Sequence, residues 1–187
     1  MKRWLKRTAL VTALLSLAFG LTACSNSATG VDLNDDMHHD TSHSMPITDR
    51  QSFALAMIPH HQQAIDLAEL AFKNSSNPDL LALASQIQSE QAAEITKMTA
   101  WLDGKAPDMT MNMEGMLSPE QMFTLSNYNG ALFDKTWTNF MYLHHMGAIE
   151  MANKVLELDD KDLADFGREI ISQQGIELDT LAKLGKQ

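Results

Sequence analysis

The chain has 187 residues, of which 24 are acidic and 14 are basic, so its formal charge is −10 at neutral pH. Such a charge repels nucleic acid and favours cations, and we therefore expect no nucleic-acid partner. The single cysteine, Cys24, excludes an internal disulfide. By contrast, 13 methionines and seven histidines supply ligands of the kind that soft metal ions prefer.

The first 23 residues are typical of a bacterial secretion signal. Four basic residues are followed by about 15 apolar or small ones, too few for a membrane-spanning helix of about 20. The segment ends Leu-Thr-Ala-Cys, which resembles the lipobox of bacterial lipoproteins, with Cys24 as the lipidated residue. An ordinary secretory signal with a chance cysteine is the alternative. Cleavage before Cys24 would remove four basic and no acidic residues and change the formal charge to −14.

Residues 24–47 are predicted to be a flexible tether, because small and polar residues dominate and apolar ones are sparse. The tether contains a short tract of histidine and methionine, and such tracts often bind metal. The alternative is a solvated linker with incidental histidines. The candidate ligands in this tract are His38, His39 and His43.

Residues 48–187 are predicted to form one all-α domain, since no stretch alternates as a strand would. Thr48 and Gln51 read as a capping box that opens a helix over about 49–73. Asn77 and Pro78 open the second helix, which Gly104 stops. A crossover over 104–117, a short helix to about 127, and two long helices over about 134–158 and 160–184 complete the domain.

A motif occurs twice, 84 positions apart. Residues 57–61 read Met-Ile-Pro-His-His and residues 141–145 read Met-Tyr-Leu-His-His, and both continue as an Ala-Ile-acid-apolar-Ala helical run. Residues 89–95 and 172–178 also match, at a spacing of 83. Each repeat therefore reads as an αα-hairpin, and two such hairpins make a four-helix bundle of the ferritin-like kind.

Both His pairs fall near the midpoints of their helices, so we expect four imidazoles to converge at the waist of the bundle, where bundles build metal sites. The methionine that opens each motif shares a helix face with its His pair. Spacing alone does not decide which His of each pair points inward. The primary candidate ligands are His60, His61, His144, His145, Met57, Met141 and Met146.

A hydrogen-bonded core network without metal is the alternative for these histidines. Polar side chains of the second and fourth long helices would then hold the rings. If metal binds, the same side chains would lie behind the ligands and orient them. The candidates are Gln91, Glu94, Gln174 and Glu177. Pro59, inside the first helix, either kinks the chain to re-aim His60 or is tolerated without a function.

The crossover carries a second methionine cluster, in a segment where core packing requires none. Its alternating Met-x-Met pattern resembles the motifs of extracytoplasmic copper and silver carriers. Two or three thioethers favour Cu(I) or Ag(I) over Zn(II). The alternative is a hydrophobic flap over the end of the bundle. The residues concerned are Met109, Met111, Met113 and Met116.

Enzyme motifs are not found in the sequence. Di-iron bundles use Glu-x-x-His, but none of the four helical histidines has an acidic residue three positions before it. His-Glu-x-x-His is absent, and the chain has no phosphate-binding glycine loop. We therefore expect a binding protein without turnover.

Residues 57–68, followed by Gln-x-x-Glu-Ile-x-x-Met-x-x-Trp-Leu at 91–102, resemble the bacterial secreted family called "domain of unknown function 305". The resemblance covers about 48–184 and implies a ferritin-like four-helix bundle. Some members are linked to periplasmic copper binding and copper tolerance. In the second copy Leu143 replaces the proline, and Leu181 and Leu184 stand where the first copy has Met98 and Trp101. The resemblance implies roles for Met57, His60, His61, Met141, His144 and His145.

Together these patterns predict an extracytoplasmic protein, anchored by lipid to the cell membrane or outer membrane and facing the periplasm in a Gram-negative cell. It would sequester copper or pass it to an unidentified exchange partner, with Cu(I) as the first expectation and Cu(II) or Ag(I) as alternatives. Two other functions remain open. One is a copper-dependent redox enzyme that uses the same His cluster, and the other is a structural or partner-binding bundle without metal.

Overall fold

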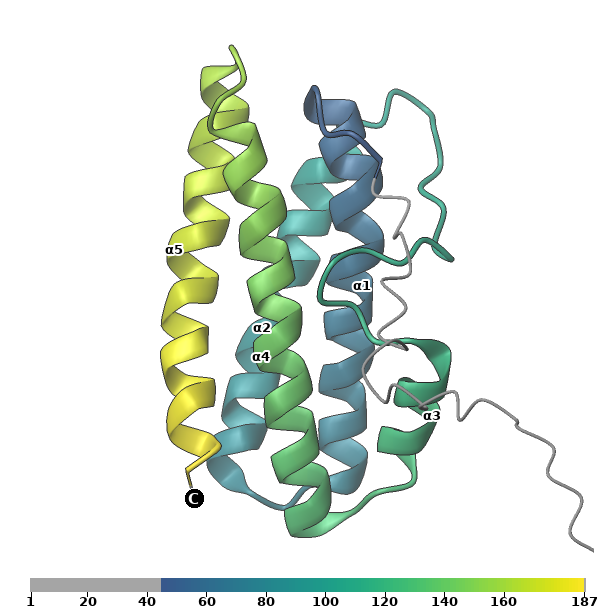
Figure 1. Cartoon of the computed structure of the whole chain (residues 1–187), viewed down its shortest axis with the longest axis vertical. Helices are drawn as coiled ribbons and strands as arrows, with labels where there is room; N and C mark the ends of the chain where they lie inside the picture. Colours follow the sequence, from purple (N-terminus) through teal and green to yellow (C-terminus); the bar gives the residue numbers. More distant parts are fainter. Residues whose placement is uncertain (1–44, 187) are drawn as a thin grey trace, which may run out of the picture. The chain divides into compact units, whose positions relative to one another are not determined.

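The computed structural model describes residues 45–186, which form five helices and, within that range, no strand (Figure 1). The four long helices are α1 (Arg50–Asn74), α2 (Pro78–Thr99), α4 (Gly130–Val155) and α5 (Lys161–Leu184), and α3 (Pro119–Ser126) is short. The all-α four-helix bundle expected from the duplication is confirmed. The signal segment, Cys24 and the tether histidines His38, His39 and His43 lie outside the described residues.

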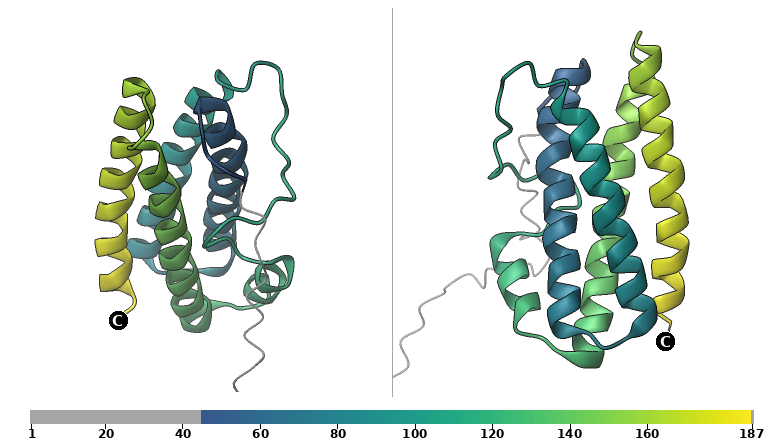
Figure 2. Two further views of the ribbon diagram at one scale, coloured as in Figure 1. Left: turned by 45° about the horizontal axis from the view of Figure 1, so that its top comes forward. Right: turned by 180° about the vertical axis from the view of Figure 1, so that it is seen from behind.

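The long helices pair as the repeat predicts. α1 packs along α2, α4 packs along α5, and the two hairpins meet mainly where α1 contacts α4 (Figure 2). α1 and α5 run down the bundle in the view of Figure 1, whereas α2 and α4 run up it. The two His motifs therefore lie on antiparallel helices that touch each other.

Several helix ends differ from those expected. Asp49, not Thr48, caps α1: its carboxylate accepts from the Ser52 N–H at 2.7 Å, and Ser52 completes the capping box. Gln51 instead donates to the Leu102 carbonyl. α4 begins at Gly130, four residues early, because its first turn buries Phe133 completely. α2 ends at Thr99, before the left-handed turn that Gly104 makes with φ +80°.

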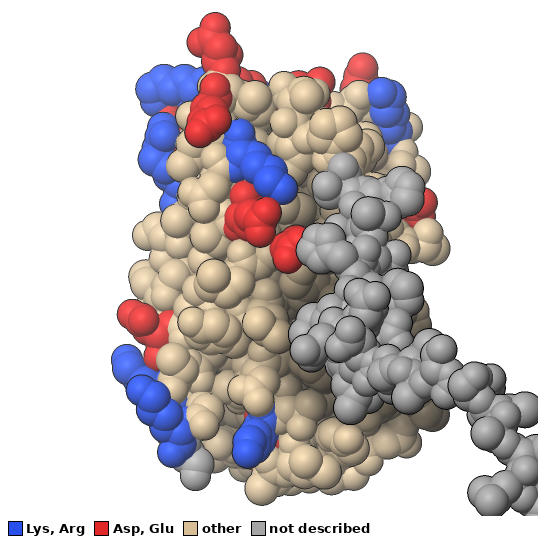
Figure 3. Space-filling model, in the orientation of Figure 1, with Lys and Arg blue, Asp and Glu red and all other residues tan. Residues whose placement is uncertain are grey.

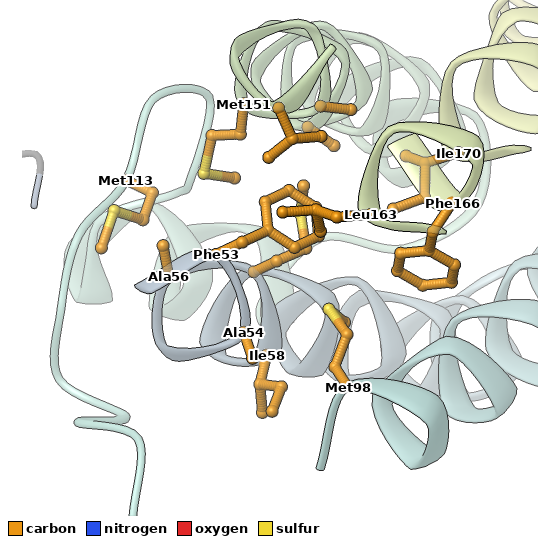
Figure 4. Packing of buried hydrophobic residues seen from close by; sticks show 14 of the residues in the cluster. Phe53, Ala54, Ala56, Ile58, Met98, Met113, Met151, Leu163, Phe166 and Ile170 are labelled. Carbon is orange, nitrogen blue, oxygen red and sulfur yellow. The ribbon is translucent and has the colours of Figure 1, made fainter. Parts of the chain in front are cut away.

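The core consists of two apolar clusters with a polar layer between them. The upper cluster contains Phe53, Met57 and Met151, and Figure 4 shows its packing. The lower cluster contains Trp137 and Met141. The four helical histidines, Gln91, Gln174 and Glu177 are also buried, and along each helix they fall between the residues of the two clusters.

Residues 105–117, which we call the strap, lead from the first hairpin to α3, and residues 113–117 lie against α1 and α4. Gly147 of α4 makes this close approach possible, since a Cβ there would lie 1.9 Å from the Glu114 carbonyl oxygen. Gly115 has φ +80°, and a Cβ there would lie 2.5 Å from the Leu143 carbonyl oxygen. Met113 of the strap enters the upper cluster (Figure 4). The strap is therefore packed against the side of the bundle rather than placed as a flap over its end.

Candidate metal centre

The two His pairs meet at the contact between α1 and α4. All four imidazoles are fully buried. The rings of His60 and His144 pack on each other with centroids 3.8 Å apart and an interplanar angle of 40°. The centroids of His61 and His145 lie 6.4 Å and 6.3 Å from those of their sequence neighbours. His60 and His144 therefore form the central pair of the layer.

His61 and His145 turn toward the partner helix of their own hairpin. His61 Nε2 lies 2.6 Å from a carboxylate oxygen of Glu94 on α2. His145 Nε2 lies 2.8 Å from a carboxylate oxygen of Glu177 on α5. The two pairs are equivalent under the sequence repeat. The structure thus brings together Glu94 and Glu177 with the histidines, as the repeat suggested.

One hydrogen bond fixes the protonation of His60. Its Nε2 lies 3.1 Å from the backbone carbonyl oxygen of Glu114 in the strap. A carbonyl can only accept, so Nε2 carries the proton and Nδ1 presents a lone pair. Within residues 45–186, the Nδ1 atoms of all four histidines are buried without a hydrogen-bond partner, as is Nε2 of His144.

Burial keeps the rings of His60, His144 and His145 neutral. It lowers the pKa of His60 to about 3, with the nearby His61 as the next cause. Burial likewise lowers the pKa of His145 to about 3 and that of His144 well below its ordinary value. A neutral imidazole with an accessible lone pair is the form that binds a metal ion. These three rings are therefore neutral, as metal binding requires, at neutral pH.

The carboxyl groups of Glu90 on α2 and Glu177 on α5 face each other at the edge of the His layer. Burial raises the pKa of Glu177 to about 7. Burial and the facing Glu177 carboxyl raise the pKa of Glu90 to about 7. Glu90 also accepts a hydrogen bond from Gln173 at 2.6 Å. Sequence reasoning did not select Glu90, although it is the repeat equivalent of Gln173 and lies beside Gln91.

Both predicted glutamines also lie in the layer. Gln91 and Gln174 are each 2% exposed, and neither atom of either side-chain amide has a hydrogen-bond partner among the described residues. Such buried amides are usually satisfied by ordered water. Several buried polar atoms of the layer therefore have no direct hydrogen-bond partner among the described residues.

The predicted thioethers fall into separate places. Met57 and Met141 are both fully buried, Met57 in the cluster above the His layer and Met141 in the cluster below it. Met146 is 47% exposed on the outer face of α4, since two residues after His144 a helix has turned by about 200°. The structure therefore does not bring Met146 to the histidines.

The waist of this outer face is mostly uncharged. In Figure 3 charged side chains lie mainly toward the two ends of the bundle. Leu143, Met146 and Ile176 are exposed on α4 and α5 near the level of the His layer.

No described helix is long and apolar enough to cross a membrane.

The strap methionines do not form one cluster. Met113 is 4% exposed in the upper cluster, and Met111 is partly buried against the same cluster. Met109 and Met116 line a surface hollow between the strap, α1 and α3, and Met116 also packs against the upper cluster. The first and last methionines of the strap thus line the hollow, whereas the two between them do not.

The donor set of the layer suits a soft or intermediate ion better than a hard one. Within residues 45–186, no three side chains among His, Cys, Asp and Glu are arranged to hold one metal ion. Two imidazoles with an added thioether fall outside that description. Such a set of donors would suit an ion of low coordination number that accepts sulfur.

A family model described as "Domain of unknown function (DUF305)" matches residues 50–184, and the chain belongs to this family. No curated protein matches the chain. Solved structures of the family do. A DUF305 fragment from Deinococcus radiodurans has a TM-score of 0.69 and 27% identity, covering 76% of this chain and 100% of its own. A DUF305 protein from Streptomyces coelicolor, described as secreted, has a TM-score of 0.65 and 26% identity, covering 73% and 91%.

A third group of similar structures contains metal. CopM in its Cu(I)-bound form has a TM-score of 0.63 and 27% identity, covering 74% of this chain and 95% of its own. CopM has also been solved with Cu(II) and with silver. The fold of this chain is therefore shared with a protein that binds these ions.

Proposed function

We propose that this DUF305 protein binds copper at the waist of its bundle, through His60 and His144 with the thioethers of Met57 and Met141, and sequesters it or passes it on. One observation supports this most strongly: buried, neutral imidazoles present unpartnered Nδ1 atoms. Leaving such atoms unpaired costs about 1–3 kcal/mol each, which an ion would offset.

The groups behind the rings support the same proposal. A metal-binding histidine usually donates its other N–H to a carboxylate or a backbone carbonyl. His60 faces the Glu114 carbonyl, and His61 and His145 face carboxylates. His61 and His145 are thus available as further ligands once an ion enters the layer. These partners hold the rings in a defined orientation before any ion arrives.

The proposed ion is Cu(I), with Cu(II) and Ag(I) as alternatives. Thioethers favour the monovalent ions, whereas imidazoles accept both oxidation states. CopM, with about 27% identity, has been solved with each of the three ions. Because two imidazoles and two thioethers carry no charge, a bound Cu(I) would keep its positive charge in the buried layer, beside the carboxyl groups of Glu94 and Glu177.

The location that we propose is extracytoplasmic, with lipid on Cys24 as the membrane anchor. The proposal depends on the sequence of the first 24 residues, and the family member described as secreted agrees with it. Thioethers neither ionise nor form disulfides, so they remain usable in an oxidising compartment. The copper would then be handed to an exchange partner that is still to be identified.

Anaerobic Cu(I) titration against a competing chelator tests the His centre. We expect the variant His60→Gln/His144→Gln to lose one Cu(I) equivalent, because glutamine supplies an amide but no imidazole. Thr138→Val, at another buried polar position of α4, is the matched control and should keep it. Retention of every equivalent by a folded His variant would refute the proposal. Continuous oxidation of added Cu(I) by the native chain would favour the redox enzyme instead.

A further inference from the structure

A surface hollow of about 330 Å³ lies where α1, the strap and α3 meet. Three thioethers line it: Met109 and Met116 from the strap, and Met122 from α3. The α1 side is formed by residues that include Pro59, Gln62 and Asp66. The sequence pattern had grouped Met109 and Met116 with two other strap methionines, and Met122 was not selected at all. The fold therefore assembles a different set of three.

The main chain beneath this hollow is firmly held. The side-chain amide of Gln63 donates to the Leu117 carbonyl at 2.8 Å and accepts from the Leu117 N–H at 2.7 Å. The Met116 sulfur accepts from the Met113 N–H at 3.3 Å, which restrains the thioether. A capping box between Ser118 and Gln121 fixes the start of α3, one turn before Met122. Met116 and Met122 are thus positioned by contacts that do not depend on an ion.

The lining is chemically selective. Thioethers are neutral and soft, so two or three of them attract Cu(I) or Ag(I) and bind Zn(II) poorly. The carboxylate of Asp66 already accepts a hydrogen bond from Gln62 at 3.0 Å. Met109 is 51% exposed, which leaves one ligand free to swing and an ion free to exchange.

We propose that Met109, Met116 and Met122 form a second, surface site for one monovalent soft ion, Cu(I) or Ag(I). This site shares its cargo with the proposed function but uses none of the ligands of the His centre. The strap contributes to both sites, because Glu114 holds His60 and Met116 lines the hollow. The surface site would bind ions from solution close to the point where Glu114 of the strap contacts His60 of the buried centre.

Silver titration of the full chain in mild detergent, followed by NMR of ¹³C-labelled methionine methyl groups, tests this site. We expect the methyl signals of Met109, Met116 and Met122 to shift together over one Ag(I) equivalent. Those of Met111 and Met113 should stay in place during that step, because these side chains do not line the hollow. Zn(II) should move none of the five.

A pair of variants gives the second measurement. The triple variant Met109→Leu/Met116→Leu/Met122→Leu should lose one Ag(I) equivalent, and Met-to-Leu changes cost less than about 1.5 kcal/mol each. The matched control Met111→Leu/Met113→Leu should lose none. Any ligands of the tether are present in every variant, so the difference measures the hollow alone. Retention by the triple variant, or equal loss in the control, overturns the proposal.

The His variant separates this site from the His centre. If His60→Gln/His144→Gln keeps every ion while the triple methionine variant loses one, the surface site stands and the proposed His centre fails. If the His variant loses an ion while the methionine signals do not move, the opposite holds.

Discussion

Gly147 provides the sharpest test of how the strap is held. Ordinarily, replacing a glycine inside a helix by alanine stabilises a protein by about 0.5–1 kcal/mol. At Gly147 the new Cβ would lie 1.9 Å from the Glu114 carbonyl oxygen and 2.6 Å from its carbon, so the strap backbone itself must move. No side-chain rotation can relieve a contact between Cβ and backbone.

The cost follows from what the strap contributes. Moving Glu114 breaks its bond to His60 and leaves a buried N–H unpaired, which costs about 1–3 kcal/mol. Withdrawing Met113 from the upper cluster costs about 1.5–3 kcal/mol more. After the helix-propensity gain is subtracted, Gly147→Ala should lower the free energy of unfolding by about 2–5 kcal/mol.

Urea unfolding measured by circular dichroism gives this free energy. Gly175→Ala is the matched control, because a Cβ at Gly175 of α5 meets nothing within 4 Å and should stabilise by about 0.5–1 kcal/mol. Hydrogen exchange of the Met113 and Met116 amides should speed up in Gly147→Ala only. A Gly147→Ala protein as stable as the Gly175→Ala protein would show that the strap does not rest on α4.

Two further predictions concern stability. In the metal-free protein the pKa values of His60 and His145 are about 3, whereas the value in the unfolded chain is 6.5. Between pH 3 and 6.5 the unfolded chain therefore binds more protons than the folded protein, and the free energy of unfolding falls as the pH falls. The raised pKa values of Glu177 and Glu90, both about 7, act in the opposite direction between pH 4.5 and 7. The steep loss should therefore begin below pH 4.5, at about 3 kcal/mol per pH unit for the two histidines, and the lowered pKa of His144 adds to it. Urea unfolding from pH 7 to 3.5 measures this, and constant stability over that range would contradict it. Trp137→Phe removes the buried bond from Trp137 Nε1 to the Leu67 carbonyl, 2.8 Å long, and should cost about 2 kcal/mol in the same assay. Exchange of the strap amides should not change in this variant, and faster exchange there would show that the two core clusters are coupled.

The duplication predicted the fold because it acts through helix periodicity. A repeated motif places equivalent residues at equivalent heights, so the bundle and the meeting of the two His pairs followed from spacing. That His60 and His144, and not His61 and His145, form the central pair required the structure. The carboxylate partners Glu94 and Glu177 followed from the same repeat. Their distances and the burial of the rings required the three-dimensional packing.

The strap could not be predicted in the same way. Its course depends on a close approach of backbone to backbone at Gly115 and Gly147, and no side-chain periodicity reports such a contact. Which strap methionines enter the core and which line the hollow follows from that course. Met122 was missed because an isolated methionine on a short helix carries no pattern.

The repeat also explains how the strap is attached. Gln63 in the first copy and Gly147 in the second are equivalent positions, because each lies two residues after the second His of its pair. Gln63 holds Leu117 of the strap with two hydrogen bonds, whereas Gly147 makes room for Glu114. If the two copies were identical, both α1 and α4 would carry a glutamine that hydrogen-bonds the strap, or both would carry a glycine that makes room for its backbone. Divergence at this position lets two similar hairpins hold a single, asymmetric strap, and Glu114 of that strap contacts His60.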